Sequence, residues 1–473
     1  MLRYLPLPPD LDISENGETL RNVRIIEITD LGRSIAMVMV ADLVPGLKRL
    51  LAPLGLKDSA KLLVIRVVVA FLLHPGRMSC LRAGGAVRCE ARHRAQISRF
   101  LARPRWRKLD INSILRQQLL EREPADGLFV FIIDATLTSQ AGKKTENTFS
   151  TGNRKRRPCK KRRHGKTKHA KKNCHSFTMG LLITPSGVRI PFCKAYHTRD
   201  YCKKTGRTHL TTAEAAAALI RTLPLPEGAH VIVLGDTAYD AEVVHDACRD
   251  RHYSWIFPCN SERVLAGPKG QRPKVRSLLK NWSTWSRQTI RLAPGQGPYA
   301  VYRRLSPHRI GPKAKPRTYD VHQERQQVRS VGEVRLVFST TKLNLETATA
   351  DDVKILMTND LKLSVRDVVE LYSLRWQIEL FFKELKSTLG FHQYQFQKFE
   401  PVEGWAELVL TTFLYLETYR VQQMARRDLS DEEKRWWKHQ RTYGLCQAVR
   451  LATELKELQY IADCLETPGG RAN

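Results

Sequence analysis

The sequence has few acidic residues for its size and no apolar run long enough to cross a membrane. Against 79 Lys and Arg there are only 47 Asp and Glu, which gives a formal net charge of +32. This excess favours a polyanionic partner, and nucleic acid fits it better than an acidic membrane surface. The most apolar run, at 62–73, contains Arg66 and is shorter than the about 20 residues that span a bilayer. We therefore predict a buried helix there and no membrane partner.

The sequence also lacks a paired cysteine motif and an N-terminal secretory signal. Its ten cysteines are scattered without a CxxC pair, in a chain too long to depend on disulfides. The opening residues have no continuous apolar segment of the kind that directs export. We expect a cytoplasmic, nucleoid-associated protein with reduced thiols. At 473 residues and 42% hydrophobic content, the chain can form a globular protein of several domains.

Changes in composition predict the domain organisation. Strand-like β-branched and aromatic runs begin near residue 123 and then alternate with helix formers, which indicates a mixed α/β sheet. We predict these strands at 127–134, 176–184, 187–193, 230–236 and 253–258, with further short strands at 285–292, 298–304, 333–340 and 353–359. The predicted regions are a helical N-terminal DNA-binding region (1–122), an α/β core in two parts (123–259 and 346–395), a β-rich insertion (260–345) and a helical C-terminal region (396–473).

Two aspartates stand at the ends of the two most apolar strand-like runs. Asp134 follows FVFII and Asp236 follows VIVLG. A carboxylate at a strand end beside a loop can leave the core and reach a ligand. With Glu379 they make three oxygen donors, which suit a pair of Mg²⁺ ions able to promote phosphoryl displacement. Acids at strand ends are common, so an ordinary surface role stays open on this observation alone.

The segment LYSLRWQIELFFKELKSTLG, at 371–390, places polar residues regularly within an apolar helical pattern. At about 100° per residue, one narrow stripe beside the apolar face holds Tyr372, Arg375, Glu379 and Lys386. A polar stripe in that position lines a cleft or another molecule. Glu384 is a rival third acid, but it falls across the helix from the stripe, so we favour Glu379.

A basic run follows the first aspartate's strand, with twelve Lys or Arg between 154 and 172. If the strands on either side pair, this run is the loop of their hairpin and neutralises phosphates beside Asp134. The residues predicted to contact DNA there are Arg154, Lys155, Arg156, Arg157, Lys160, Lys161, Arg162 and Arg163. A disordered loop that binds any polyanion is the alternative. Zinc binding by Cys159, His164, Cys174 and His175 is disfavoured, because their spacing matches no standard finger.

A second basic element precedes the sheet. The pattern CEARHRAQISRFLARPRW, which includes Arg94 and Arg99, is typical of a helix that faces DNA phosphates. Periodicity alone does not separate a helix-turn-helix from any short helical bundle, and a solvated basic helix is the plain alternative.

The spacing of Tyr372, Arg375, Glu379 and Lys386 reproduces the Y-R-E-K motif. With Asp134 and the GDTAYD segment, the sequence resembles bacterial cut-and-paste DDE transposases of the insertion-sequence-4 superfamily over residues 125–395. The resemblance implies an RNase H-like catalytic core with a β-rich insertion. It also implies that Asp134, Asp236 and Glu379 bind two Mg²⁺ ions, for which Mn²⁺ substitutes, and that the other three motif residues hold phosphates of the transposon end.

The same resemblance implies a reaction and partners. Water attacks at the element's end to release a 3′ hydroxyl, which then attacks double-stranded target DNA within a homodimeric synaptic complex. In members that excise through a hairpin, a flipped base stacks on a tryptophan of the insertion, for which Trp282 and Trp285 are the candidates.

Two other functions compete. A tyrosine recombinase with Tyr372 as nucleophile needs an Arg and His cluster and no metal. A basic DNA-binding protein derived from a transposase would bind without cleaving, although the presence of all three acids argues against that loss.

Overall fold

The computed structural model describes residues 30–74, 79, 82, 92–103, 106–140, 142, 144–151, 172–267, 272–280, 285–293, 297–303, 316–341 and 350–466. They fall into two compact units. The first contains Met1–Asn112, Lys383–Phe396 and Glu400–Asn473, and the second contains Ser113–Phe382 and Gln397–Phe399.

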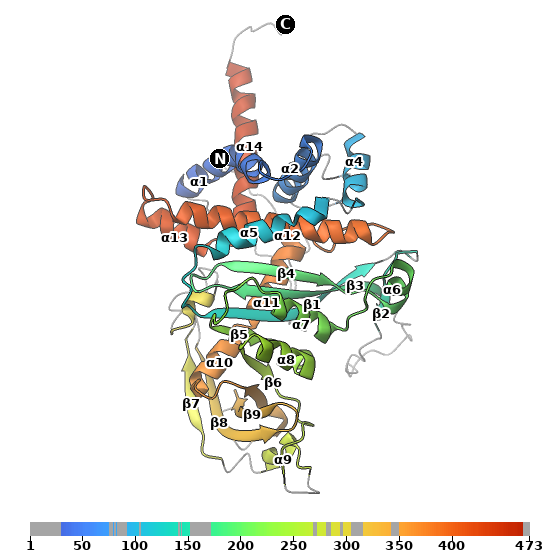
Figure 1. Ribbon diagram of the computed structural model, residues 1–473. Helices are drawn as coiled ribbons and strands as arrows, with labels where there is room; N and C mark the ends of the chain where they lie inside the picture. The colour runs from blue at the N-terminus through green and yellow to red at the C-terminus, as the bar shows by residue number, and fades with distance from the viewer. Residues whose placement is uncertain are drawn as a thin grey trace, which may run out of the picture. The chain divides into compact units, whose positions relative to one another are not determined.

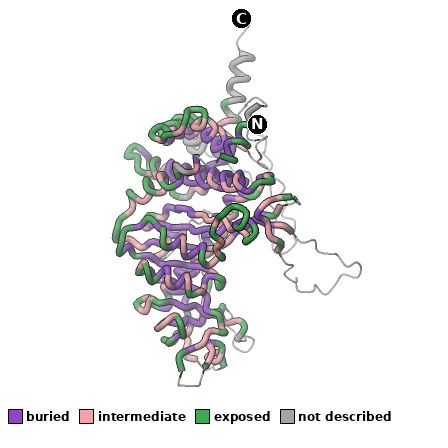
Figure 2. The backbone as a smooth tube through the Cα atoms, turned by 45° about the vertical axis from the view of Figure 1, so that its right-hand side comes forward, coloured by how far each residue is buried: buried purple, intermediate pink, exposed green. Residues whose placement is uncertain are grey.

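The second unit is built on a mixed ten-stranded sheet, which confirms the predicted α/β class (Figure 1). Its core strands are β1(Phe129–Gln140), β2(Phe149–Thr151), β3(Lys172–Ile183), β4(Arg189–Ala195), β5(Val231–Leu234) and β6(Ser254–Pro258). β3 pairs antiparallel with β1, β2 and β4, whereas β1, β5 and β6 run parallel. The central strands are apolar and buried on both faces (Figure 2), as expected for parallel strands covered by helices.

The predicted insertion continues this sheet. Its strands are β7(Gln288–Leu292), β8(Arg317–Val328) and β9(Gly332–Thr340), and β10(Lys354–Thr358) returns to pair antiparallel with both β9 and β6. The prediction of a strand at 298–304 is wrong, because residues 300–302 form the 3₁₀ turn η5(Ala300–Tyr302). β8 was not predicted, since its RTYDVHQERQQV sequence is too polar to read as a strand.

Short helices accompany the strands of this unit. They are α5(Ile111–Leu120), α6(Arg199–Thr205), α7(Thr212–Arg221), η3(Thr237–Tyr239), α8(Glu242–Asp250), α9(Val275–Leu278), η7(Ala350–Asp352), α10(Val365–Ser373) and α11(Trp376–Lys383). α7 and α8 lie side by side, and α7 packs on β3 and β4. A capping box starts α7: the Thr211 hydroxyl accepts from the Glu214 N–H, and the Glu214 carboxylate accepts from the Thr211 N–H.

The first unit is helical. It contains α1(Asp30–Leu51), α2(Asp58–Leu73), α4(Arg92–Leu101), η2(Trp106–Leu109), the π-helix η8(Glu384–Thr388), α12(Glu400–Met424), α13(Asp431–His439) and α14(Thr442–Glu466). The predicted buried helix at 62–73 is confirmed, because α2 buries a continuous run from Val67 to Leu72. No helix within the described ranges is both long and apolar enough to cross a membrane.

The prediction of one helix over 371–390 is wrong in detail. α10 ends at Ser373, and α11 begins at Trp376. The turn between them is held by i to i+3 bonds, including Arg375 N–H to the Tyr372 carbonyl at 3.0 Å and Ile378 N–H to the Arg375 carbonyl at 3.2 Å. This tighter winding turns Arg375 relative to an ideal α-helix.

Candidate active site

Asp134 lies within β1, at the point where the strand stops being fully buried. The four residues before it, from Val130 to Ile133, are completely buried, whereas the Asp134 side chain is 20% exposed. Its Oδ1 accepts a hydrogen bond from the Ala135 N–H at 2.7 Å. The apolar strand therefore fixes the backbone, and the other carboxylate oxygen, Oδ2, faces Arg375.

Asp236 comes to the same edge of the sheet from the neighbouring strand. β1 and β5 are parallel, with Ile132 opposite Leu234, so each aspartate stands two residues beyond a paired position. The Asp236 carboxylate caps η3, because its Oδ1 accepts the Ala238 N–H at 2.9 Å. For Asp236 this position, beyond the carboxyl end of β5, is the usual location of a site in an open α/β sheet. The prediction that Asp134 ends its strand is wrong, because β1 continues to Gln140 in its pairing with β3.

Glu379 joins the aspartates through an arginine. The Arg375 guanidinium donates to Glu379 Oε1 at 2.5 Å and lies 3.5 Å from Asp134 Oδ2. All three side chains are partly exposed, between 20% and 34%. Arg375 thus bridges two acids that are far apart in sequence.

The electrostatics place Asp236 in the same group. Burial raises the pKa of Asp134 above its usual value, and the negative charges of Asp236 and Glu379 raise it further, against the opposing effect of Arg375. Arg375 therefore bridges Asp134 and Glu379, and the charge of Asp236 acts on Asp134. The site carries more negative charge than Arg375 neutralises.

Tyr372 and Lys354 form one wall of the site. Tyr372 is buried, and burial, with smaller effects from Asp236 and Asp134, raises the pKa of its hydroxyl to about 12. The Lys354 ammonium lies 4.5 Å from the centre of the Tyr372 ring. Burial lowers the pKa of the Lys354 ammonium, and the positive charge of Arg375 lowers it further.

Tyr239 packs beneath the two aspartates. Its side chain is 1% exposed, and its hydroxyl has no hydrogen-bond partner among the described residues. A Cβ at Gly235 would lie 3.1 Å from the Tyr239 side chain, so glycine allows this close packing. Burial raises the pKa of the Tyr239 hydroxyl, and Asp134 and Asp236 raise it further, so this donor stays protonated close to both carboxylates.

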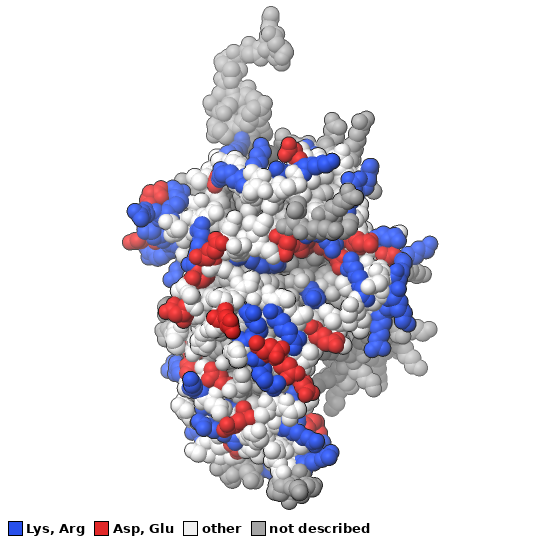
Figure 3. Space-filling model, viewed as in Figure 1, with Lys and Arg blue, Asp and Glu red and all other residues white. Residues whose placement is uncertain are grey.

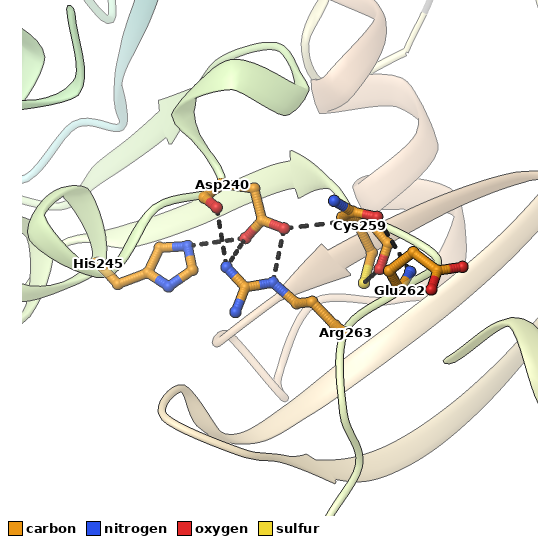
Figure 4. A network of polar contacts seen from close by, with 6 residues as sticks. Asp240, His245, Cys259, Glu262 and Arg263 are labelled. Atoms are coloured by element: carbon orange, nitrogen blue, oxygen red, sulfur yellow. Dashed lines mark hydrogen bonds and ion pairs between the residues drawn. The ribbon is translucent and has the colours of Figure 1, made fainter. Parts of the chain in front are cut away.

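A buried network holds the turn that carries Asp236. Asp240, four residues on, lies between Arg263 and His245 (Figure 4). Arg263 donates to its two carboxylate oxygens at 2.7 and 2.5 Å, and His245 Nε2 lies 3.2 Å from Oδ1. Although burial favours the neutral acid, the hydrogen bonds from His245 and Arg263 hold the pKa of Asp240 below its usual value. His245 in turn stacks on Trp255, with the ring centres 4.4 Å apart.

The donor chemistry of the site suits a hard divalent cation. Three carboxylates with excess negative charge are ligands of the kind that Mg²⁺ prefers. Across the described parts of the chain, however, no group of three or more His, Cys, Asp or Glu side chains is arranged to hold a metal ion. The Arg375 guanidinium engages Asp134 and Glu379 directly, so these carboxylates fit a metal ion only if Arg375 releases them.

Lys386 and Glu384 are in η8, which belongs to the first unit. Burial lowers the pKa of Lys386, and burial, with a smaller effect from the Glu384 charge, raises that of Cys446. Arg99 is exposed in the last turn of α4, and Arg94 lies in the same helix, with its side chain outside the described residues.

In the insertion, the Trp285 ring stacks on that of His322, with the ring centres 4.4 Å apart, and also contacts the Phe338 ring. Trp282 and the basic residues Arg154, Lys155, Arg156, Arg157, Lys160, Lys161, Arg162 and Arg163 lie outside the described residues. The two strands that flank this run do pair, as Thr151 lies opposite Lys172.

No pattern in the sequence indicated Lys354, Tyr239 or the Asp240 network. Lys354 is one lysine at the start of a strand, which carries no pattern. Tyr239 does lie in the GDTAYD segment, where an aromatic residue three positions after an acid could have suggested a partner for it.

A comparison with protein families gives one match. The family model described as the transposase DDE domain matches residues 127–415, which include Asp134, Asp236 and Glu379. None of the curated proteins compared with this chain matches it.

Proposed function

Because the chain belongs to the transposase DDE-domain family, we propose that it cleaves DNA at transposon ends and joins the freed strand to target DNA. We further propose the cut-and-paste, insertion-sequence-4 type, on the basis of its Y-R-E-K spacing. The observation that supports the proposal is that Arg375 bridges Asp134 and Glu379, two acids from distant segments, while the charge of Asp236 acts on Asp134. Its DDE family generally uses divalent metal ions and acts on DNA.

In this proposal Asp134, Asp236 and Glu379 hold two Mg²⁺ ions, which Mn²⁺ can replace. When bound, the ions supply activation of the attacking oxygen and charge stabilisation of the leaving oxygen. Arg375 must then leave Asp134 and Glu379. A guanidinium released beside the acids is suited to bind a DNA phosphate in bidentate fashion.

In this proposal Tyr372 and Lys354 orient the DNA. At neutral pH Tyr372 keeps its proton, since its pKa is about 12, and its hydroxyl can donate to a phosphate. Lys354 adds a cation beside it. A buried tyrosine with so high a pKa is a poor nucleophile, which weakens the tyrosine-recombinase alternative.

The remaining predicted contacts extend this proposal. We assign Lys386, Arg94, Arg99 and the basic run at 154–163 to double-stranded DNA, at the transposon ends or the target. Trp285 remains a candidate for stacking on a flipped base, and its present contacts with His322 and Phe338 would have to change for a base to enter. Because synapsis brings two ends together, a homodimer is expected on DNA.

The test is strand cleavage by Glu379→Gln on DNA that carries the inverted repeats flanking the gene. We expect cleavage to fall by more than about a hundredfold, since even an outer-shell partner of a metal ligand contributes up to that factor. End binding should persist. Glu384→Gln is the control, because Glu384 is the rival third acid, five positions on in η8, and this variant should cleave normally.

If Glu379→Gln cleaves DNA at the wild-type rate, the assignment of Glu379 as a metal ligand is wrong. Binding of the ends by the wild-type protein without Mg²⁺-dependent nicking would instead support the basic DNA-binding protein that has lost cleavage.

A further inference from the structure

The short helix α6 is held firmly in the second unit. The Thr198 hydroxyl caps its N-terminus by accepting the Tyr201 N–H, and Gly206 ends it in the left-handed conformation, with φ of 71°. Its own residues Tyr201 and Cys202 are buried, so they anchor the helix on the protein. Asn147 fastens the chain before the helix, because its side chain donates to the Tyr196 carbonyl and accepts the Thr198 N–H, both at 2.8 Å.

The outer face of α6 presents unneutralised positive charge. Arg199 and Lys203 are exposed and lie four residues apart, so they share one face of the helix. Neither makes an ion pair with any described residue, and Asp200 beside them does not pair with them either. Like charges at this spacing weaken a helix slightly. Figure 3 shows Lys and Arg gathered over α6.

The nearby acid is already used by other lysines. Glu146 accepts from Lys204 at 2.8 Å and from Lys398 at 3.0 Å, and these hydrogen bonds hold the pKa of Glu146 low despite the opposing effect of burial. Within the described residues of the α6 region (144–149, 194–209 and 397–399), seven Lys or Arg face two acids. The seven are Lys144, Lys194, Arg199, Lys203, Lys204, Arg207 and Lys398.

The sheet register relates α6 to the acids. Asp134 pairs with Met179, which pairs with Cys193, so these three residues form one row across β1, β3 and β4. β4 ends two residues later, at Ala195, and α6 begins at Arg199. The helix therefore follows the strand that lies two strands away from Asp134 in the same unit.

We propose that Arg199 and Lys203 form a phosphate-contact surface for double-stranded DNA, in the same unit as the three acids. The inference rests on the proposed function, because DNA is the partner of the same unit. Arg199 and Lys203 are unneutralised cations on one face of α6, and phosphates of a DNA backbone bound there would neutralise them. The surface positions the duplex and reads no sequence.

The test compares two double variants of the full chain that lose the same charge. Arg199→Gln/Lys203→Gln removes both cations of the proposed surface. Arg221→Gln/Arg249→Gln is the matched control, because both arginines are exposed but are already paired, with Asp250 at 3.0 Å and Asp246 at 2.6 Å. Binding to a random-sequence duplex is measured by fluorescence polarisation over a series of salt concentrations.

We expect the slope of log affinity against log salt to become shallower in Arg199→Gln/Lys203→Gln, by about 0.9 for each phosphate that the variant no longer neutralises. The control should keep the wild-type slope. Equal changes in both variants, or no change in either, would overturn the proposal. If the wild-type protein does not bind the duplex at low salt, the proposed function itself fails. Thermal unfolding of each variant confirms that it is folded.

Discussion

Two clusters of acid and arginine lie in the second unit, and they differ in how completely the acid is neutralised. Asp240 is 1% exposed and receives two hydrogen bonds from Arg263, with His245 on its other side. Asp134 and Glu379 stay partly exposed and share Arg375 with each other, beside a third acid. A saturated cluster fixes the backbone, whereas an unsaturated one retains charge for a ligand.

The pKa values of the two aspartates move in opposite directions, although both start from the same effect. Both carboxylates are desolvated, which favours the neutral acid. At Asp240 the hydrogen bonds outweigh this effect and the pKa falls, while at Asp134 the neighbouring acids add to it and the pKa rises. The turn at 236–240 thus carries two aspartates of different kinds: Asp240, which is structural, and Asp236, which is a candidate catalytic residue.

The largest predicted effect is on folding, through Asp240→Asn. The change leaves Arg263, which is 17% exposed, without its counter-ion. We expect the free energy of unfolding to fall by about 3 kcal/mol, as when a buried ion pair is broken. Urea unfolding followed by tryptophan fluorescence measures it, since Trp255 stacks within the network.

The matched control for this comparison is Asp246→Asn. Asp246 also pairs with an arginine, Arg249, at 2.6 Å, but both side chains are exposed. We expect a loss below about 1 kcal/mol. If the two variants lose equal stability, burial does not distinguish the Asp240 network.

A smaller effect is expected from Tyr239→Phe, which removes only the buried hydroxyl beside Asp134 and Asp236. If this hydroxyl donates to a metal ligand or its water, cleavage should fall about tenfold while DNA binding stays unchanged. Tyr302→Phe is the control, because the Tyr302 hydroxyl donates to the Leu128 carbonyl at 2.6 Å, away from the acids. The free energy of unfolding of Tyr302→Phe should fall by about 1 kcal/mol, and its cleavage rate should be that of the wild-type protein. A wild-type cleavage rate in Tyr239→Phe would exclude the role.

The sequence was sufficient for the mixed sheet, because apolar β-branched runs such as FVFII and VIVL specify buried strands wherever they pair. The spacing of the Y-R-E-K motif also put Arg375 and Glu379 on one stripe, and the structure joins these two residues by an ion pair. It did not predict β8, whose polar residues form a strand because β7 and β9 pair on either side of it. Tertiary pairing there overrides local preference.

The details of the candidate site depend on contacts that a linear sequence does not encode locally. Arg263 meets Asp240 across 23 positions, and nothing in either segment marks the pairing. The Arg375 bridge depends on the turn between α10 and α11, where ideal helical angles no longer apply. Periodicity could therefore group these residues on one stripe but could not show which acid Arg375 would bind.

The central claim is that Asp134, Asp236 and Glu379 form an under-neutralised cation site. Its most direct measurement is thermal unfolding of the wild-type protein and Asp134→Asn over a range of Mg²⁺ concentrations. The raised pKa of Asp134 means that its contribution to stability is full below the unfolded pKa and is lost as pH rises through the folded pKa. At neutral pH without metal, Asp134→Asn should therefore unfold at a higher temperature than the wild-type protein.

Mg²⁺ should then stabilise the wild-type protein, by about 1.4 kcal/mol at tenfold excess over its dissociation constant, and should not stabilise the variant. An equal response to Mg²⁺ in both proteins, or a metal-free variant less stable than the wild-type protein, would contradict the account.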